Sequence, residues 1–155
     1  MLTKIVSGGQ TGADQAGLDV AIKFGIPHGG WIPKGRLTED GPLLEHYQLE
    51  EMATDSYPKR TKQNVIDSDG TLLISHGKLT GGSDFTRKMT AEHNKPWLHL
   101  DMENMSFSYA SRMLQSWIID NGIKVLNVAG PRASKDPEIY DMTVKILEGA
   151  LHHKR

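Results

Sequence analysis

Cysteine is absent from the 155-residue sequence, and this absence excludes disulfide bonds, thiolate zinc sites and thiol catalysis. Long apolar runs are absent as well, since no stretch approaches the ~18 residues that a membrane-spanning helix requires. Residues 1–6 lead into a strand-like run and lack the apolar core of a signal peptide. Together these absences predict a cytoplasmic protein that has no membrane partner.

Neither sign of charge is in excess, because 18 basic and 19 acidic residues leave a formal net charge of −1. Such a balance produces no overall field that would attract nucleic acid or a membrane surface, so we expect neither as a partner. The histidines show none of the paired spacings typical of metal ligands, which predicts that there is no metal site. The length fits a single ligand-binding domain over residues 1–155.

Short apolar runs alternate with longer amphipathic ones along the chain. This alternation is typical of βα units, and it predicts an α/β fold with a doubly wound, mainly parallel sheet of about five strands and helices on both faces. The run Leu72–Ile74 is continuously apolar, as expected of a strand that is covered on both faces. The strands are expected at 3–7, 27–32, 70–75, 96–101 and 124–129.

Five helices are expected after these strands, because apolar residues recur there with a period of about 3.6 residues. Gly25 and Gly122 are expected to end the first and the fourth helix, and Pro137 lies at the start of the last. The helices are expected at 13–24, 56–66, 83–94, 107–118 and 139–150.

The segment 33–55 has only a weak apolar pattern, around Leu43, Leu44 and Tyr47. A connection of this length inside a compact domain is usually functional or mobile. The sequence leaves open whether this segment closes over a ligand.

Ligands of a doubly wound sheet bind beyond the carboxyl ends of the strands, where loops meet helix N-termini. The first such turn contains Gly8, Gly9 and Gly12 around Gln10 and Thr11. Its glycines allow a ligand to approach the backbone, and the helix that follows offers free N–H groups to a phosphate. The alternative is an ordinary turn in which Thr11 caps the helix. The spacing is neither that of a dinucleotide-binding fingerprint nor that of a Walker A loop.

A second turn, before the third helix, contains Gly81 and Gly82 with hydroxyls at Ser83 and Thr86. Two glycine-rich turns at one sheet edge predict a two-sided cradle for a phosphate-bearing ligand. A third turn, 130–134, adds a glycine and an arginine and is less informative.

Four further residues are candidate ligand contacts. Lys34 and Arg36 follow the second strand, and Arg60 and Asn64 share one face of the second helix. Arg60 lies in a first turn, where the helix dipole disfavours a cation, so we expect an anion beside it. Either Asp40 or a ligand phosphate would serve.

Four segments occur in a characteristic order: 7–14, then 30–36 followed by 39–41, then 60–65, and 67–71. Together they resemble the family of putative molybdenum carrier proteins, a circularly permuted YpsA-like branch of the SLOG nucleotide-binding superfamily. The resemblance implies a Rossmann-like fold, a nucleotide-like ligand or the molybdenum cofactor, and a homo-oligomer. Phosphoribohydrolases of this superfamily carry a glycine-rich motif ending in a catalytic glutamate, and the residues after Gly82 do not match it.

Two functions follow as hypotheses. The first is a carrier or sensor that binds a phosphate-bearing nucleotide-like or pterin ligand and has no chemistry of its own. The second is a hydrolase that cleaves an N-glycosidic or phosphate bond of a nucleotide derivative. In the second case Asp14, Asp84 or Asp40 would be the general acid or base.

Overall fold

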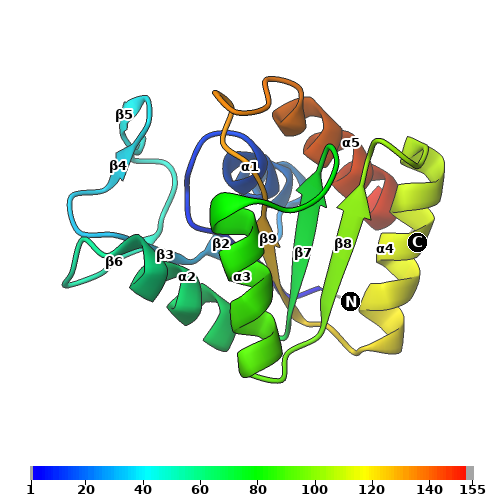
Figure 1. Cartoon of the computed structure of the whole chain (residues 1–155), viewed down its shortest axis with the longest axis horizontal. Helices are drawn as coiled ribbons and strands as arrows, with labels where there is room; N and C mark the ends of the chain where they lie inside the picture. Colours follow the sequence, from blue (N-terminus) through cyan, green and yellow to red (C-terminus); the bar gives the residue numbers. More distant parts are fainter. Residues whose placement is uncertain (1, 153–155) are drawn as a thin grey trace.

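The computed structural model describes residues 2–152, and its centre is a five-stranded parallel sheet. The strand order is β2-β1-β9-β7-β8 (Figure 1). The predicted α/β fold with five strands is confirmed. The strands are β1 Lys4–Val6, β2 His28–Gly29, β7 Gly70–Ser75, β8 Trp97–Asp101 and β9 Val125–Ala129.

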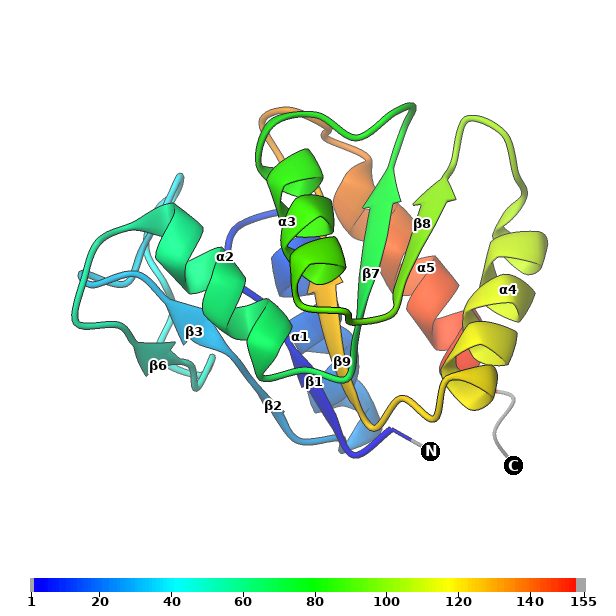
Figure 2. The same ribbon diagram turned by 60° about the horizontal axis from the view of Figure 1, so that its bottom comes forward.

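Five helices cover the two faces of this sheet, as the sequence predicts. α1, α4 and α5 pack together on one face, and α2 and α3 pack together on the other (Figures 1 and 2). The helices are α1 Ala13–Phe24, α2 Tyr57–Ile66, α3 Gly81–Glu92, α4 Phe107–Asp120 and α5 Ile139–His152. Within residues 2–152 no helix has the length and apolarity to span a membrane.

Local sequence explains where these elements begin and end. The side chain of Ser56 accepts a hydrogen bond from the Lys59 N–H at the start of α2, and Ser106 does the same for Tyr109 at the start of α4. Gly25 ends α1 in the left-handed conformation, with φ of 69°. All six residues of β7 are buried, which matches its continuous apolar run.

The expected strand at 27–32 is wrong, because the chain changes sheets at Gly30. β2 belongs to the central sheet, whereas β3, Trp31–Ile32, pairs with β6, Glu50–Glu51, in a separate two-stranded sheet. Gly30 has φ of 121°, and a Cβ there would lie 2.1 Å from the carbonyl oxygen of Ser7. A side chain at this position is therefore excluded both by the backbone conformation and by the space.

The segment 33–55 is an ordered excursion beside the sheet. It contains β4, Leu37–Thr38, and β5, Gly41–Pro42, which form an antiparallel pair, and it also contains β6. It also contributes to a second apolar cluster, separate from the main core. The cluster consists of Leu18, Ile32, Leu43, Tyr47 and Leu49.

Candidate functional site

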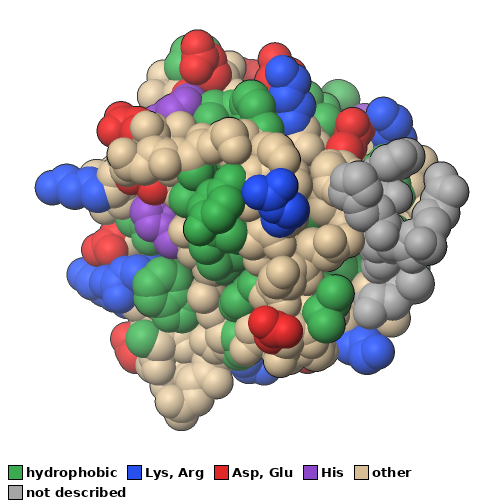
Figure 3. All heavy atoms as spheres, turned by 90° about the vertical axis from the view of Figure 1, so that its right-hand side faces the viewer, with side chains coloured by type: hydrophobic (Ala, Val, Ile, Leu, Met, Phe, Trp, Pro, Cys, Tyr) green, Lys and Arg blue, Asp and Glu red, His purple; other side chains and the backbone are tan. Residues whose placement is uncertain are grey.

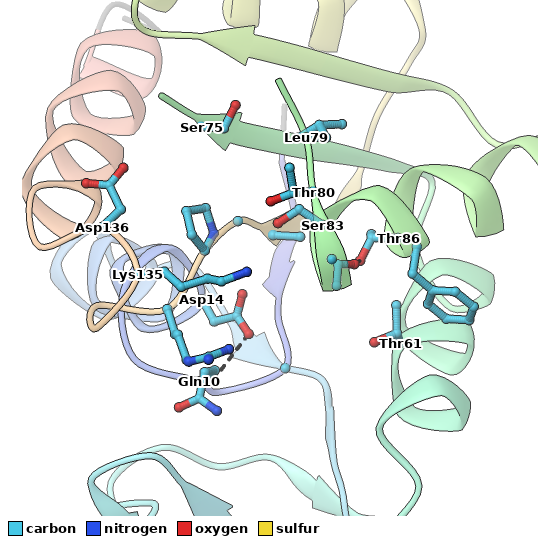
Figure 4. Close-up of a pocket in the computed structure, with 18 of the residues that line it drawn as sticks. Gln10, Asp14, Thr61, Ser75, Leu79, Thr80, Ser83, Thr86, Lys135 and Asp136 are labelled. Atoms are coloured by element: carbon cyan, nitrogen blue, oxygen red, sulfur yellow. Dashed lines mark hydrogen bonds between the residues drawn. The ribbon is translucent and has the colours of Figure 1, made fainter. Parts of the chain in front are cut away.

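A cleft of about 1010 Å³ lies over the carboxyl ends of the central strands (Figure 4). It is bounded by the β1–α1 turn, one face of α2, the β7–α3 turn with the first turns of α3, and the connection 130–137 after β9. α1 and α3 lie on opposite faces of the sheet. The connection from β1 to α1 therefore leaves the sheet edge toward one face, and the connection from β7 to α3 leaves it toward the other. Ligands of open α/β sheets bind in such a crevice.

The N-terminus of α3 faces the cleft with unused hydrogen-bond donors. Among the described residues, the N–H groups of Gly81 and Gly82 have no acceptor, whereas those of Ser83 and Asp84 bond to the Thr80 carbonyl. Thr80 is the N-cap, and its side chain makes no capping bond. The aligned peptide dipoles add a partial positive charge at this position.

The ammonium group of Lys135 stands beside the same helix end. A Cβ on Gly81 would lie 3.4 Å from Lys135 Nζ, and within residues 2–152 no carboxylate pairs with this lysine. Figure 4 shows Lys135 directed into the cleft toward Thr80 and Ser83. A cation and a helix N-terminus repel one another, so an anion between them would be bound by both.

Arg60 and Asp14 meet over Gly8, and all three residues line the cleft. Arg60 Nη1 donates to the Gly8 carbonyl at 2.7 Å, and Asp14 Oδ2 accepts from the Gln10 N–H at 3.2 Å. A Cβ on Gly8 would lie 2.4 Å from Arg60 Nη1 and 3.0 Å from Asp14 Oδ2. The acidic group beside Arg60 is therefore Asp14, and the alternative of Asp40 is wrong.

Burial shifts both of these charged groups toward neutrality. It raises the pKa of Asp14 to about 6, against the opposing effects of the Arg60 charge and of the backbone N–H groups of Gln10 and Gly8. It also lowers the pKa of Arg60, an effect that the Asp14 charge opposes. An acid with this pKa changes its charge within the range of ordinary buffers.

Glu39 ties the β4–β5 hairpin to the rim of the cleft. Its carboxylate accepts hydrogen bonds from Thr11 Oγ1 at 2.5 Å and from Ser134 Oγ at 2.5 Å, and it pairs with Arg132 at 3.2 Å. These bonds hold the pKa of Glu39 below its usual range. Thr38 and Glu39 both line the cleft, so the long segment does reach the candidate site.

Several predicted ligand contacts line the cleft together. Gly8, Gln10 and Asp14 come from the first glycine-rich turn, and Arg60 and Asn64 come from α2. The second turn contributes Gly81, Gly82, Ser83 and Thr86. Their role in binding stays a prediction, but the two glycine-rich turns do face one concavity.

Other predicted contacts make bonds inside the protein. Arg36 donates to the carbonyls of Leu43 and Tyr47, among others, and so organises its own segment. Lys34 is exposed, and neither it nor Arg36 lines the cleft. The amide of Asn64 is used by the backbone N–H and carbonyl of Trp31.

The acid Asp84 is also engaged outside the cleft. It pairs with Arg87 at 3.2 Å and with Lys88 at 3.5 Å on its own helix, and it is not among the residues that line the cleft. Its role as a catalytic acid stays a prediction, and we leave it out of the proposed site.

Sequence reasoning missed several cleft residues. Lys135 lies beyond the third turn, and His76 is bonded to Asp136 at 2.6 Å across the cleft rim. Ser75, at the end of β7, is bonded to His99 at 2.7 Å. The one sequence signal for this region is Gly130, the glycine of the third turn. A Cβ at this position would lie 2.7 Å from the Ile74 carbonyl oxygen, so the close approach of the two strands requires a glycine.

Groups of His, Asp and Glu that could hold a metal ion do not occur among residues 2–152.

Comparison with known proteins identifies the family. The circularly permutated YpsA SLOG family matches residues 5–151. A crystal structure of a putative molybdenum carrier protein from Syntrophus aciditrophicus SB is 57% identical, with a TM-score of 0.95, over 97% of this chain and 95% of that one. Comparison with curated proteins finds no match. The chain therefore belongs to the circularly permutated YpsA SLOG family.

Proposed function

We propose that this protein binds a phosphate-bearing small molecule in the cleft, either a nucleotide or a pterin such as the molybdenum cofactor, and acts as its carrier. The name of the Syntrophus relative supports a carrier role. The absence of a metal-ligating cluster among residues 2–152 fits a site in which the metal belongs to the cargo.

The observation that carries this proposal is the convergence of two positive groups to which no carboxylate of residues 2–152 is paired. The free N–H groups of Gly81 and Gly82 and the Lys135 ammonium face the same space. An oxyanion placed there would accept charge-assisted hydrogen bonds, each worth about 1.5–3 kcal/mol. The Ser83 hydroxyl, which also lines this part of the cleft, would add a further donor.

The rest of the cleft suits a polar ring system attached to the oxyanion. Asp14 and Arg60 place an acceptor and a donor side by side over Gly8, and the ring of Tyr57 and the apolar Pro58 and Leu79 contribute flat or apolar surface. A cleft of about 1010 Å³ lies at the upper end of the usual range for small-molecule sites. A nucleoside monophosphate or a pterin phosphate has matching chemistry.

Thermal shift and calorimetry with molybdopterin, nucleoside monophosphates and ADP-ribose test the proposal. A ligand at about 100 times its dissociation constant stabilises the folded state by about 2.7 kcal/mol, which is a readily measured rise in melting temperature. If none of these compounds shifts the melting temperature at millimolar concentration, the proposed function is wrong.

Lys135→Ala localises the binding. We expect the dissociation constant of the best ligand to rise about tenfold or more, because about 1.4 kcal/mol of attraction to the oxyanion is lost. Lys62→Ala, which removes an exposed lysine of α2 outside the cleft, is the matched control and should leave affinity unchanged. Equal affinity in the two variants would place the oxyanion elsewhere.

A further inference from the structure

Hydrophobic side chains gather on the face formed by α4 and β8, far from the cleft (Figure 3). Tyr109 is 49% exposed and Ile119 is 70% exposed. A shallow, open groove of about 520 Å³ runs along α4, with Leu98 of the edge strand β8 on its far side. Exposed apolar surface around a groove is typical of a protein–protein contact.

Two ridges of α4 shape this groove. Tyr109, Met113 and Trp117 are spaced four residues apart and form an aromatic and apolar ridge, and all three line the groove. Ridges of this spacing are the surfaces by which helices most often pack, with the ridge of one helix in the groove of another. The groove is therefore of the kind that accepts a helix.

The second ridge is polar and symmetric. It consists of Arg112, Ser116 and Asp120, again four residues apart, and all three line the groove. Within residues 2–152 neither Arg112 nor Asp120 has an ion-pair partner. The two opposite charges lie about 6 Å along the helix on either side of Ser116.

The charges of this ridge are complementary to those of an identical ridge that runs in the opposite direction. If an identical helix packs antiparallel with the two Ser116 residues opposite each other, Arg112 of each copy lies at the height of Asp120 of the other. The small Ser116 side chain at the crossing point allows the helices to approach closely. Such a two-fold contact is isologous, because the same patch serves both copies.

We propose that the α4 groove is the interface of a homodimer, in which a second copy of this chain packs its α4 antiparallel and forms two Arg112–Asp120 ion pairs. The apolar ridge supplies the buried area, and the paired charges fix the direction and the register. The interface is separate from the ligand cleft and does not rest on the proposed function.

Charge reversal tests this register. Sedimentation velocity of the wild-type chain at concentrations up to about 1 mM should show a dimer. Arg112→Asp and Asp120→Arg each convert both ion pairs into like-charge contacts, so each should raise the dimer dissociation constant about tenfold or more. All three residues of the polar ridge are exposed, so the variants should fold, as circular dichroism would check.

Restoration is the decisive outcome. The double variant Arg112→Asp/Asp120→Arg should dimerise as the wild type does, and an equimolar mixture of the two single variants should form a heterodimer. Lys59→Asp and Glu45→Arg make the same changes in net charge at exposed positions outside the groove and should leave the dimer intact. A monomeric wild type, a dimer indifferent to both reversals, or reversals that no combination restores would each overturn the proposal.

Discussion

The glycines of the β1–α1 turn are required largely by contacts within the protein. A Cβ on Gly9 would lie 2.9 Å from Leu49 of the second apolar cluster, and a Cβ on Gly12 would lie 2.5 Å from the Pro131 carbonyl oxygen. Both residues also have positive φ. Of Gly8, Gly9 and Gly12, only Gly8 lines the cleft. The glycines of this turn are therefore needed mainly for close packing within the protein, and only Gly8 borders the candidate site.

Gly12→Ala and Gly82→Ala should therefore have opposite effects. At Gly12 the new methyl group meets backbone at positive φ, so we expect a loss of about 3 kcal/mol or more in the free energy of unfolding. At Gly82 nothing lies within 4 Å of the new methyl group, and alanine is about 0.5–1 kcal/mol better than glycine within a helix. Urea denaturation measures both changes.

The same Gly82→Ala protein tests the site without a change of fold. Its methyl group would stand at the helix end to which we assign the oxyanion, so ligand affinity should fall while stability is kept or improved. Wild-type affinity in this variant would contradict the role assigned to the α3 N-terminus.

The buried carboxyl of Asp14 should make stability depend on pH. Its pKa is about 6 in the folded protein against an ordinary value of 3.8, so the folded state binds the proton more tightly than the unfolded state. The stabilisation is complete below about pH 4 and is lost as the pH rises to about 6, by an amount of order 3 kcal/mol. Asp14→Asn removes this dependence.

Comparison of wild type and Asp14→Asn isolates this group, because the other titrating residues are common to both proteins. The free energy of unfolding of Asp14→Asn minus that of wild type should rise by a few kcal/mol between about pH 4 and pH 7, as chemical denaturation at several pH values would show. A difference that does not change with pH would mean that the Asp14 carboxyl is not destabilised by burial.

At the scale of elements, the segment 33–55 is held to the sheet at two places. Tyr47 donates to Asp19 of α1 at 2.6 Å, and the other oxygen of this carboxylate accepts from Tyr140 of α5 at 2.5 Å. Glu39 provides the second attachment, at Thr11 and Ser134. The first attachment is close to the second apolar cluster, whereas the second lies at the rim of the cleft.

Glu39→Gln should loosen the rim without unfolding the protein. The amide has one acceptor oxygen in place of two, and it loses the charge that pairs with Arg132. We expect hydrogen exchange to become about tenfold faster in 37–42 and 131–135, with exchange in the central strands unchanged. Glu45→Gln, at an exposed position away from the rim, is the control, and similar exchange in both variants would contradict the attachment.

At the scale of the whole molecule, the strand order explains why the last loop is part of the site. If the chain is followed from β9 through α5 and then from β1 onward, the spatial order β2-β1-β9-β7-β8 becomes 3-2-1-4-5. This is the order of the first five strands of a dinucleotide-binding fold, whose first strand-to-helix turn binds phosphate. In this chain that turn is the connection 130–137, which contains Lys135.

A circular permutant that begins at Ile123 should therefore fold. β1 begins and α5 ends at the same end of the molecule (Figure 2), so a linker of about ten glycine and serine residues should join them. The new termini would lie in the turn after α4, where Asn121 and Gly122 are exposed. We expect a melting temperature within about 10 °C of wild type, whereas a permutant opened within β7 should not fold.

The sequence by itself determined the α/β class, the five strands and five helices, and the two glycine-rich turns that face the cleft. These features follow from patterns within one or two elements: a continuous apolar run for β7, a 3.6-residue period for the helices, and serine or glycine at their ends. The sequence did not predict the switch of sheets at Gly30. The switch depends on the close approach of Gly30 to the Ser7 backbone, and the only local sign of this contact is the glycine itself.

Only the tertiary structure decided which charges meet. Glu39 bonds to Ser134 across 95 positions of sequence, Arg60 meets Asp14 rather than Asp40, and Lys135 stands at the N-terminus of α3. Such pairs depend on how the strands are ordered and on where each loop crosses the sheet edge, and neither is encoded in the spacing of residues along one element. The cleft is for this reason a property of the assembled sheet.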